Sequence, residues 1–302
     1  MSSAEVAGVD IILHEVKLMH VPMLQSWLRR FPRESCDYNV CNLLSWGSIY
    51  HNQYFAYQER LVLYNPQYGY VFFPVGEWME PEELQDLLRQ MQKVNPNASL
   101  ILIPDEYLDA KPQMEDMFEL ATDRDWADYV YETQEMVELS GKKLGKKKNL
   151  ISQFRRAFPE YKVMPLSASR RQTILQFTQK WKREREVEGI YLNTEMKAIQ
   201  NTLDMWEHLP VDGIIICHQE RIVAYSIFSP QTEDMATVHF EKFDPFKKGS
   251  AQVINWETAR YLQGKYKWLN REQDIGLPGL RQAKTSYMPD KLINFITAKI
   301  KD

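Results

Sequence analysis

The residues best suited to chemistry lie in the second half of the chain, in a segment predicted to be a strand. His239 and Glu241 alternate with apolar residues between positions 236 and 243, and alternate side chains of a strand share one face. Acyl transfer to an amine requires a base for the proton of the nucleophile, donors for the developing oxyanion and an acid for the leaving group. We predict that Glu241 is the base, because a carboxylate at the end of this strand can reach an amine through water.

Two alternatives accompany this prediction. Glu241 can instead form a structural ion pair with a neighbour such as Lys242 or Arg281. His239 is the second catalytic candidate, although a half-buried strand histidine is more often packed and hydrogen-bonded than catalytic. The opposite face of the strand is expected to belong to the core, and it consists of Ala236, Val238 and Phe240.

A glycine-containing turn follows the strand and leads into a predicted helix over residues 251–262. Free N–H groups at a helix start, the positive end of the helix dipole and a residue without a side chain together let a phosphate approach the backbone. An ordinary strand-to-helix turn is the alternative. The candidate phosphate-binding residues are Lys247, Lys248, Gly249, Ser250 and Ala251.

A basic run between Lys142 and Arg156 stands out because the chain as a whole carries a net charge of -4. The run could bind the phosphates of coenzyme A, the acceptor stem of a tRNA or an anionic head group. The alternative is a solvated helix face in a linker. Its members are Lys142, Lys143, Lys146, Lys147, Lys148, Arg155 and Arg156, of which Lys146 and Lys147 are the donor-binding candidates.

A second glycine-rich turn, at residues 274–279, precedes another predicted helix. Asp274, Gly276 and Gly279 are expected to shape this turn. Arg281 and Lys284 then begin the helix, where they face either solvent or an anionic donor.

The elements that must position these residues follow an α/β order. Apolar residues at helical spacing, short β-branched runs and turn residues define the segments. In the second half we expect helices over 169–185, 193–206 and 251–262, a hairpin of 211–218 with 221–229, and strands at 236–243 and 265–270. The first half mixes helices and strands in a way that suggests a diverged copy of the second.

Composition narrows the class of protein. With 302 residues, 44% hydrophobic and 26% charged, the chain has the size of two domains and the balance of a globular protein, which excludes disordered and fibrous classes. We place the boundary at the polar, glycine-containing segment 140–148, giving domains 1–139 and 140–302. No apolar run approaches the roughly 20 residues of a membrane helix. The three cysteines suit neither a disulfide framework nor zinc, so we expect a cytoplasmic protein without a metal.

Three segments together resemble an uncharacterised bacterial family related to the C-terminal domain of phosphatidylglycerol lysyltransferase. They are residues 139–149, His239-Phe240-Glu241-Lys242, and residues 270–284. The stretch from Tyr38 to Trp46 is similar as well, so the resemblance spans nearly the whole chain. It implies an α/β fold of two tandem acetyltransferase-like (GNAT) domains, each a mixed, mostly antiparallel sheet flanked by helices.

The resemblance also implies a reaction. An acyl or aminoacyl group would pass from coenzyme A or aminoacyl-tRNA to an amine or hydroxyl acceptor. In acetyltransferases the glycine turn binds the pyrophosphate of coenzyme A, and here Lys247 to Ala251 fit the last five places of that pattern, whereas Phe246 replaces the usual Arg or Gln. Tyr287 lies where these enzymes often carry a tyrosine that protonates the leaving thiolate.

The partners implied by the resemblance are a small-molecule or lipid-head-group acceptor and a tRNA held by Lys142 to Arg156. The lysyltransferases carry a large membrane-embedded N-terminal part that is not found in this sequence, which argues against a phospholipid. A ligand-binding protein that kept the double fold without its chemistry is the alternative, and Phe246 favours it slightly. The sequence does not indicate an oligomeric state.

Overall fold

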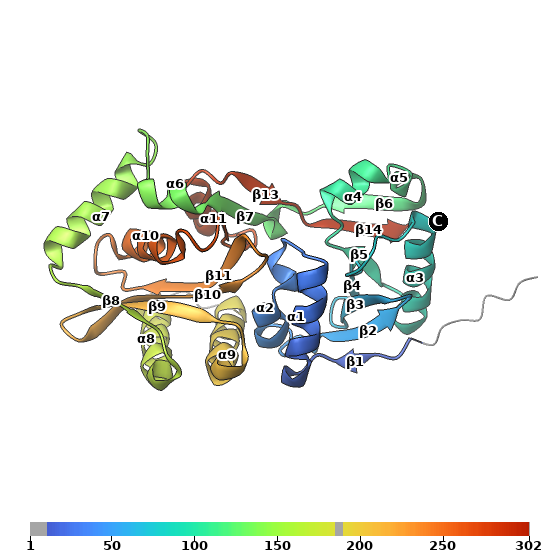
Figure 1. Ribbon diagram of the computed structural model, residues 1–302, viewed down its shortest axis with the longest axis horizontal. Coiled ribbons are helices and arrows are strands. Elements are labelled where there is room, and N and C mark those ends of the chain that lie inside the picture. The colour runs from blue at the N-terminus through green and yellow to red at the C-terminus, as the bar shows by residue number, and fades with distance from the viewer. Residues whose placement is uncertain (1–10, 185–189, 302) are drawn as a thin grey trace, which may run out of the picture. The chain divides into compact units, whose positions relative to one another are not determined.

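The computed structural model describes residues 11–184 and 190–301, which belong to two compact units (Figure 1). Unit 1 contains the chain up to Val16, residues 50–121 and the residues from Ile296 on, and unit 2 contains residues 17–49 and 122–295. We expected a single boundary after Leu139. The units are instead interleaved along the sequence, because strand β7 (Asp128–Glu132) lies within the sheet of unit 2 and helix α2 (Val40–Ser45) packs on a helix of that unit.

Unit 1 is built on a seven-stranded mixed sheet with three helices. In spatial order its strands are β1 (His14–Glu15), β2 (Gln53–Tyr57), β3 (Arg60–Asn65), β4 (Tyr70–Phe72), β5 (Ser99–Ile101), β14 (Ile296–Ile300) and β6 (Phe118–Thr122). Its helices are α3 (Pro81–Val94), α4 (Asp105–Ala110) and α5 (Met114–Met117). Helix α3 starts as its sequence favours: Pro81 occupies the first turn, and the Glu83 carboxylate accepts a hydrogen bond from the Glu80 N–H at 2.7 Å.

Unit 2 is built on a second seven-stranded mixed sheet. Its spatial order is β8 (Lys162–Pro165), β9 (Asp212–His218), β10 (Arg221–Pro230), β11 (Met235–Phe243), β12 (Trp268–Asn270), β7 and β13 (Lys291–Ile293). One face is covered by α6 (Thr133–Glu138), α7 (Gly145–Ala157) and α10 (Ser250–Leu262), and the other by α8 (Arg171–Glu184) and α9 (Ile190–Asp204) (Figure 1). The remaining helices of the unit are α1 (Val21–Arg30), α2 and α11 (Pro278–Thr285).

The two sheets share one pattern of pairing. In each, three antiparallel pairs are followed by one parallel pair, β4 with β5 in unit 1 and β11 with β12 in unit 2, and then by another antiparallel pair. A helix connects the parallel strands in both cases, α3 in one and α10 in the other. The expected fold class of two mixed, mostly antiparallel sheets flanked by helices is therefore confirmed.

A β-bulge in β11 corrects the expected arrangement of its faces. Ile227 of β10 pairs with Phe240, and the next residue, Phe228, pairs with Val238, so His239 is an extra residue without a partner in this ladder. An extra residue shifts every later side chain to the opposite face. Ala236 and Val238 accordingly pack in the core beneath α10, whereas Phe240 packs in the other core, beneath α8 and α9.

The segment expected to be an interdomain junction is half helical, because α7 begins at Gly145. Ile151 and Phe154 are the buried residues of α7 and pack into the core beneath α10. Most of the basic run from Lys142 to Arg156 therefore lies along one anchored helix.

Candidate active site

The residues that could act on a reacting group lie where the pairing of β11 with β12 ends, and this place is called the opening below. These parallel strands pair only from Met235 to Thr237 on β11, opposite Trp268 to Asn270 on β12. From Val238 on, β11 pairs with no strand on that side among the described residues. The bulge at His239 falls at this point, and bulges at such positions turn side chains toward a site.

A part-buried ion pair lies at this opening. One terminal nitrogen of Arg271, which directly follows β12, lies 2.5 Å from the Oε2 atom of Glu241. The exposed fractions of the two side chains are 15% and 12%. The guanidinium also lies near two aromatic rings, 5.8 Å from the ring centre of Tyr131 and 5.5 Å from that of Tyr287. The expected structural alternative for Glu241 named Lys242 or Arg281 as partner, and the observed partner is Arg271.

Lys147 of α7 reaches the same group of side chains. Its Nζ atom lies 4.4 Å from the ring centre of Tyr287 and donates a hydrogen bond to the Ser286 hydroxyl at 2.6 Å. Burial, followed by the charges of Arg271 and Lys146, lowers the pKa of Lys147. Burial raises the pKa of Tyr287, so its phenol is protonated at neutral pH. Of the predicted site residues, Glu241, Tyr287 and Lys147 are thus brought together.

His239 lies behind this group and not in it. Its side chain has no exposed surface, its Nδ1 atom lies 2.8 Å from Glu272 and its Nε2 atom lies 2.8 Å from the Ser229 hydroxyl. The Ser229 hydroxyl donates its own hydrogen to Asn39, so it accepts from the histidine. Burial alone lowers the pKa of His239, but Cys41 and Glu272 outweigh it and raise the pKa to about 10. This geometry supports a role in positioning the loop after β12.

Lys284 and Arg281 also hold that loop. The Lys284 ammonium donates to the backbone carbonyls of Arg271 and Glu272, and burial followed by the charge of Arg271 lowers its pKa to about 8. Arg281 lies 2.8 Å from both carboxylate oxygens of Asp274 and 2.5 Å from Asp125. Both cationic side chains therefore bind groups of the protein itself, although we had expected them to face solvent or an anionic donor.

The glycine turn is closed on one side by α7. Gly249 has a φ of 88°, and a side chain there would overlap the backbone carbonyl of Leu150. The hydroxyl of Ser250 donates to the Asp244 carbonyl at 2.7 Å. Gly249 is thus required for the close approach of α7, which supplies a structural reason for the glycine. Lys247 lies 4.0 Å from Asp244, while Lys248 is exposed.

Arg271, Glu272, Tyr131 and Asn42 are site residues that the sequence did not single out. Arg271 directly follows β12 and is 30 positions away from Glu241 in the sequence. The sequence alone therefore gave no sign that the two residues form an ion pair. Asn42, on α2, donates to the Glu272 carboxylate at 2.8 Å. The parallel order of the two strands was the available signal, because parallel neighbours bring their carboxyl ends to the same edge.

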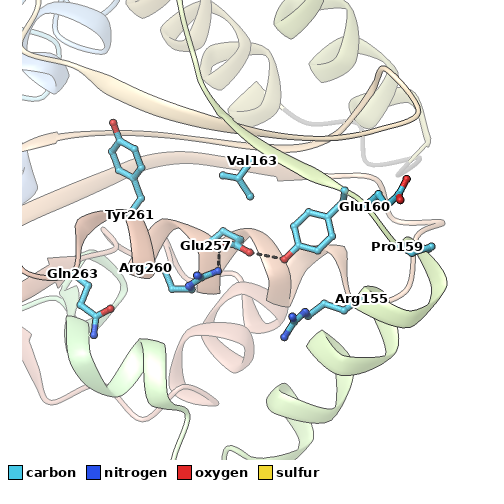
Figure 2. Close-up of a pocket in the computed structure, with 9 residues that line it drawn as sticks. Arg155, Pro159, Glu160, Val163, Glu257, Arg260, Tyr261 and Gln263 are labelled. Carbon is cyan, nitrogen blue, oxygen red and sulfur yellow. Dashed lines mark hydrogen bonds and ion pairs between the residues drawn. The ribbon is translucent and has the colours of Figure 1, made fainter.

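A pocket of about 780 Å³ lies elsewhere in unit 2, between the C-terminal ends of α7 and α10 and strand β8 (Figure 2). None of the predicted catalytic or donor-binding residues lines it. Its Glu257 carboxylate already accepts from the Tyr161 hydroxyl at 2.5 Å and from Arg260 at 2.9 Å, as the dashed lines in Figure 2 show. Arg155 is the one member of the basic run on its wall.

Cys36, Asp37 and Asp128 form a cluster whose ligand atoms lie within 4.8 Å of one another. Burial, and then the charge of Asp128, raise the pKa of the Cys36 thiol, which therefore remains neutral and bonds to Asp128 at 3.2 Å. Gln273 donates to the same sulfur at 2.9 Å.

No helix in the described ranges, 11–184 and 190–301, has the length and apolar content to cross a membrane.

Comparison with known proteins agrees with this architecture. The family model described as phosphatidylglycerol lysyltransferase, C-terminal, matches residues 28–298. A conserved protein of unknown function from Bacteroides thetaiotaomicron is similar with a TM-score of 0.88 at 28% identity, over 96% of this chain and 100% of that one.

Two further solved structures share the fold at low identity. The C-terminal domain of a putative lysylphosphatidylglycerol synthetase from Agrobacterium fabrum has a TM-score of 0.63 at 13% identity, with 94% of this chain and 92% of that chain covered. L-PGS from Bacillus licheniformis has a TM-score of 0.61 at 14% identity, with 93% and 91% covered. The resemblance found in the sequence is confirmed.

Proposed function

Because this chain belongs to the family of the C-terminal domain of phosphatidylglycerol lysyltransferase, we propose that it transfers an aminoacyl group from aminoacyl-tRNA to an amine or hydroxyl acceptor. The observation that carries the proposal is the part-buried ion pair of Glu241 and Arg271 where the pairing of β11 with β12 ends. Lys147 and Tyr287 beside the pair supply the other groups that acyl transfer needs. The proposal requires the cytoplasm, where charged tRNA is available.

Each group has a distinct part in the proposed reaction. The acceptor amine or hydroxyl attacks the ester carbonyl carbon, and Glu241 takes its proton. Arg271 and Lys147 donate hydrogen bonds to the developing oxyanion. The bond to the ribose oxygen then breaks, and Tyr287 gives that oxygen a proton, which its raised pKa keeps on the phenol. The described residues at this opening place no cysteine beside Glu241, so direct transfer in a ternary complex is the proposed order.

The test is transfer of labelled amino acids from a mixture of charged tRNAs to simple amines and to glycerol-based head groups. We expect Glu241→Gln to lower the turnover rate by about 10²-fold or more, the usual contribution of a general base, while tRNA affinity is retained. Glu257→Gln is the matched control, since Glu257 is also buried and hydrogen-bonded but lines the separate pocket.

Two results would contradict the proposal. The first is that the unaltered protein transfers no amino acid to any acceptor tested. The second is that Glu241→Gln and Glu257→Gln transfer at the same rate. Acetyl-CoA is included as a competing donor, because the turn from Lys247 to Ala251 resembles a pyrophosphate site; release of free coenzyme A with an acetylated product would favour that donor.

A further inference from the structure

Phe246 is an exposed aromatic side chain in the turn between β11 and α10. Its exposed fraction is 76%, and it is followed by Lys247 and Lys248. Single exposed hydrophobic residues are ordinary on protein surfaces, so exposure alone assigns no role. Phe246 differs from other exposed hydrophobic residues because the turn that carries it is held in place by hydrogen bonds and close packing.

This turn is fixed at both ends. The Phe246 N–H donates to the Asp244 carboxylate at 3.0 Å, and the Ser250 hydroxyl donates to the Asp244 carbonyl at 2.7 Å. Gly249 packs against the Leu150 carbonyl and lies where an added Cβ would be 3.0 Å from Phe154. A ring carried on such an anchored turn loses little additional freedom when a ligand binds it.

Helix α7 connects the turn to the candidate active site. Lys147, which contacts the Tyr287 ring, precedes Leu150 by three residues, and this separation corresponds to about 4.5 Å along the helix axis. The same helix carries much of the basic run. Helix α7 thus contacts both Gly249 of the turn and Tyr287 of the candidate active site, through residues one helical turn apart.

We infer that the Phe246 ring stacks on the terminal base of the donor RNA and that Lys248 contacts its phosphates. This inference rests on the proposed function, which supplies an RNA donor. In an aminoacyl ester the acyl carbon is joined to the ribose of the last nucleotide, so the terminal base lies one sugar away from the reacting carbon. An aromatic ring beside basic residues is the usual platform for an unpaired base. An RNA strand therefore fits the exposed aromatic ring and the basic residues of this turn.

The experiment uses a short single-stranded RNA whose 3′-terminal base is 2-aminopurine, a fluorescent base that is quenched when it stacks. The full-length protein is compared with Phe246→Ala, Phe246→Leu and Phe246→Trp. We expect Ala and Leu to weaken binding by about fivefold or more and to abolish the quenching, while Trp, which keeps an aromatic face, retains both. Trp126→Ala is the matched control, since Trp126 is also exposed, at 46%.

The outcomes separate this inference from the proposed function. Quenching that depends on Phe246, without amino acid transfer by the unaltered protein, supports the inference and removes the function. Transfer with equal RNA affinity in all Phe246 variants overturns the inference and leaves the function. Retained binding of Phe246→Leu to anionic phosphatidylglycerol vesicles, without RNA quenching in any variant, assigns the ring to a lipid surface and overturns the inference. If Phe246→Ala loses acetyl-CoA binding but keeps its affinity for RNA, the inference is overturned and the ring is assigned to coenzyme A.

Discussion

His239 illustrates at the scale of one residue how a buried charge can support a neighbouring site. Both of its ring nitrogens face acceptors, namely the Ser229 hydroxyl and the Glu272 carboxylate. Two such partners require an imidazolium, which agrees with its pKa of about 10. The ring thereby links β11 to the residue that follows Arg271.

We predict a pH-dependent contribution of His239 to stability. The folded-state pKa is raised above the usual 6.5, so the contribution is complete below pH 6.5 and is lost as pH rises toward about 10. His239→Gln should therefore lower the free energy of unfolding, and its difference from the unaltered protein should shrink over this range. Urea unfolding at several pH values measures the difference.

The control for this experiment is His208→Gln, which changes an exposed histidine. The lowered pKa of Lys284 gives a trend of opposite sign between about pH 8 and 10.5, but it is present in all three proteins and cancels in the difference. A difference between unaltered protein and His239→Gln that is constant with pH would show that the ring is not charged.

The sequence predicted part of this residue-scale arrangement. Glu241 was found because alternation along a strand is a local signal that needs no knowledge of other elements. Arg271 was missed because its proximity to Glu241 depends on the parallel pairing of β11 with β12. The exchange of faces at Phe240 was missed because a bulge leaves the pattern of residue types unchanged.

At the scale of elements, the contact between α7 and the turn before α10 depends on Gly249. Gly249→Ala should destabilise the protein by more than about 2 kcal/mol, because it combines a left-handed backbone with overlap at the Leu150 carbonyl. Gly264→Ala provides the comparison: Gly264 has a similar φ of 78°, but an added Cβ meets nothing within 4 Å, so only about 1 kcal/mol is expected. Thermal or denaturant unfolding measures both changes.

Equal destabilisation by the two substitutions would show that α7 can move away from the turn at no cost. This comparison also decides how the turn should be studied. A large side chain at Gly249 would separate α7 from α10, so loss of donor binding in such a variant would report lost packing. Lys248, which is exposed, is the better position for testing phosphate contacts.

Elements were predicted better than their packing. The helix over 251–262 and the hairpin before it follow from periodicity and β-branched runs, and the structure places them at Ser250–Leu262 and at β9 and β10. The segment 140–148 was interpreted as a linker because lysine and glycine dominate it. Ile151 and Phe154, farther along, are the residues that anchor it as the start of α7.

At the scale of the whole molecule, charge is unevenly distributed. The net charge is -4, yet Lys142 to Arg156 contain seven basic residues and no acidic one. When a protein binds a single-stranded nucleic acid, each phosphate that it neutralises releases counterions and contributes about 0.7 to the magnitude of the slope of log affinity against log salt concentration. Lys142, Lys143 and Lys146 are exposed and so are available for such contacts.

We therefore predict that changing Lys142, Lys143 and Lys146 together to Ala lowers this slope by up to about 2 in RNA filter binding. Lys147 is left unchanged because it contacts Ser286 and Tyr287. The matched control changes three exposed lysines of unit 1, Lys93, Lys299 and Lys301. Equal slopes for the two triple variants would remove the basic run from the RNA contact.

The position of β14 has a consequence for synthesis on the ribosome. This strand, residues 296–300, pairs with β5 inside the sheet of unit 1, between β5 and β6. Until β14 has been synthesised, β5 has an unpaired edge, and unpaired strand edges can pair with other chains. Because β14 follows residues 122–295 of unit 2 in the sequence, the sheet of unit 1 cannot be completed until those residues have been synthesised.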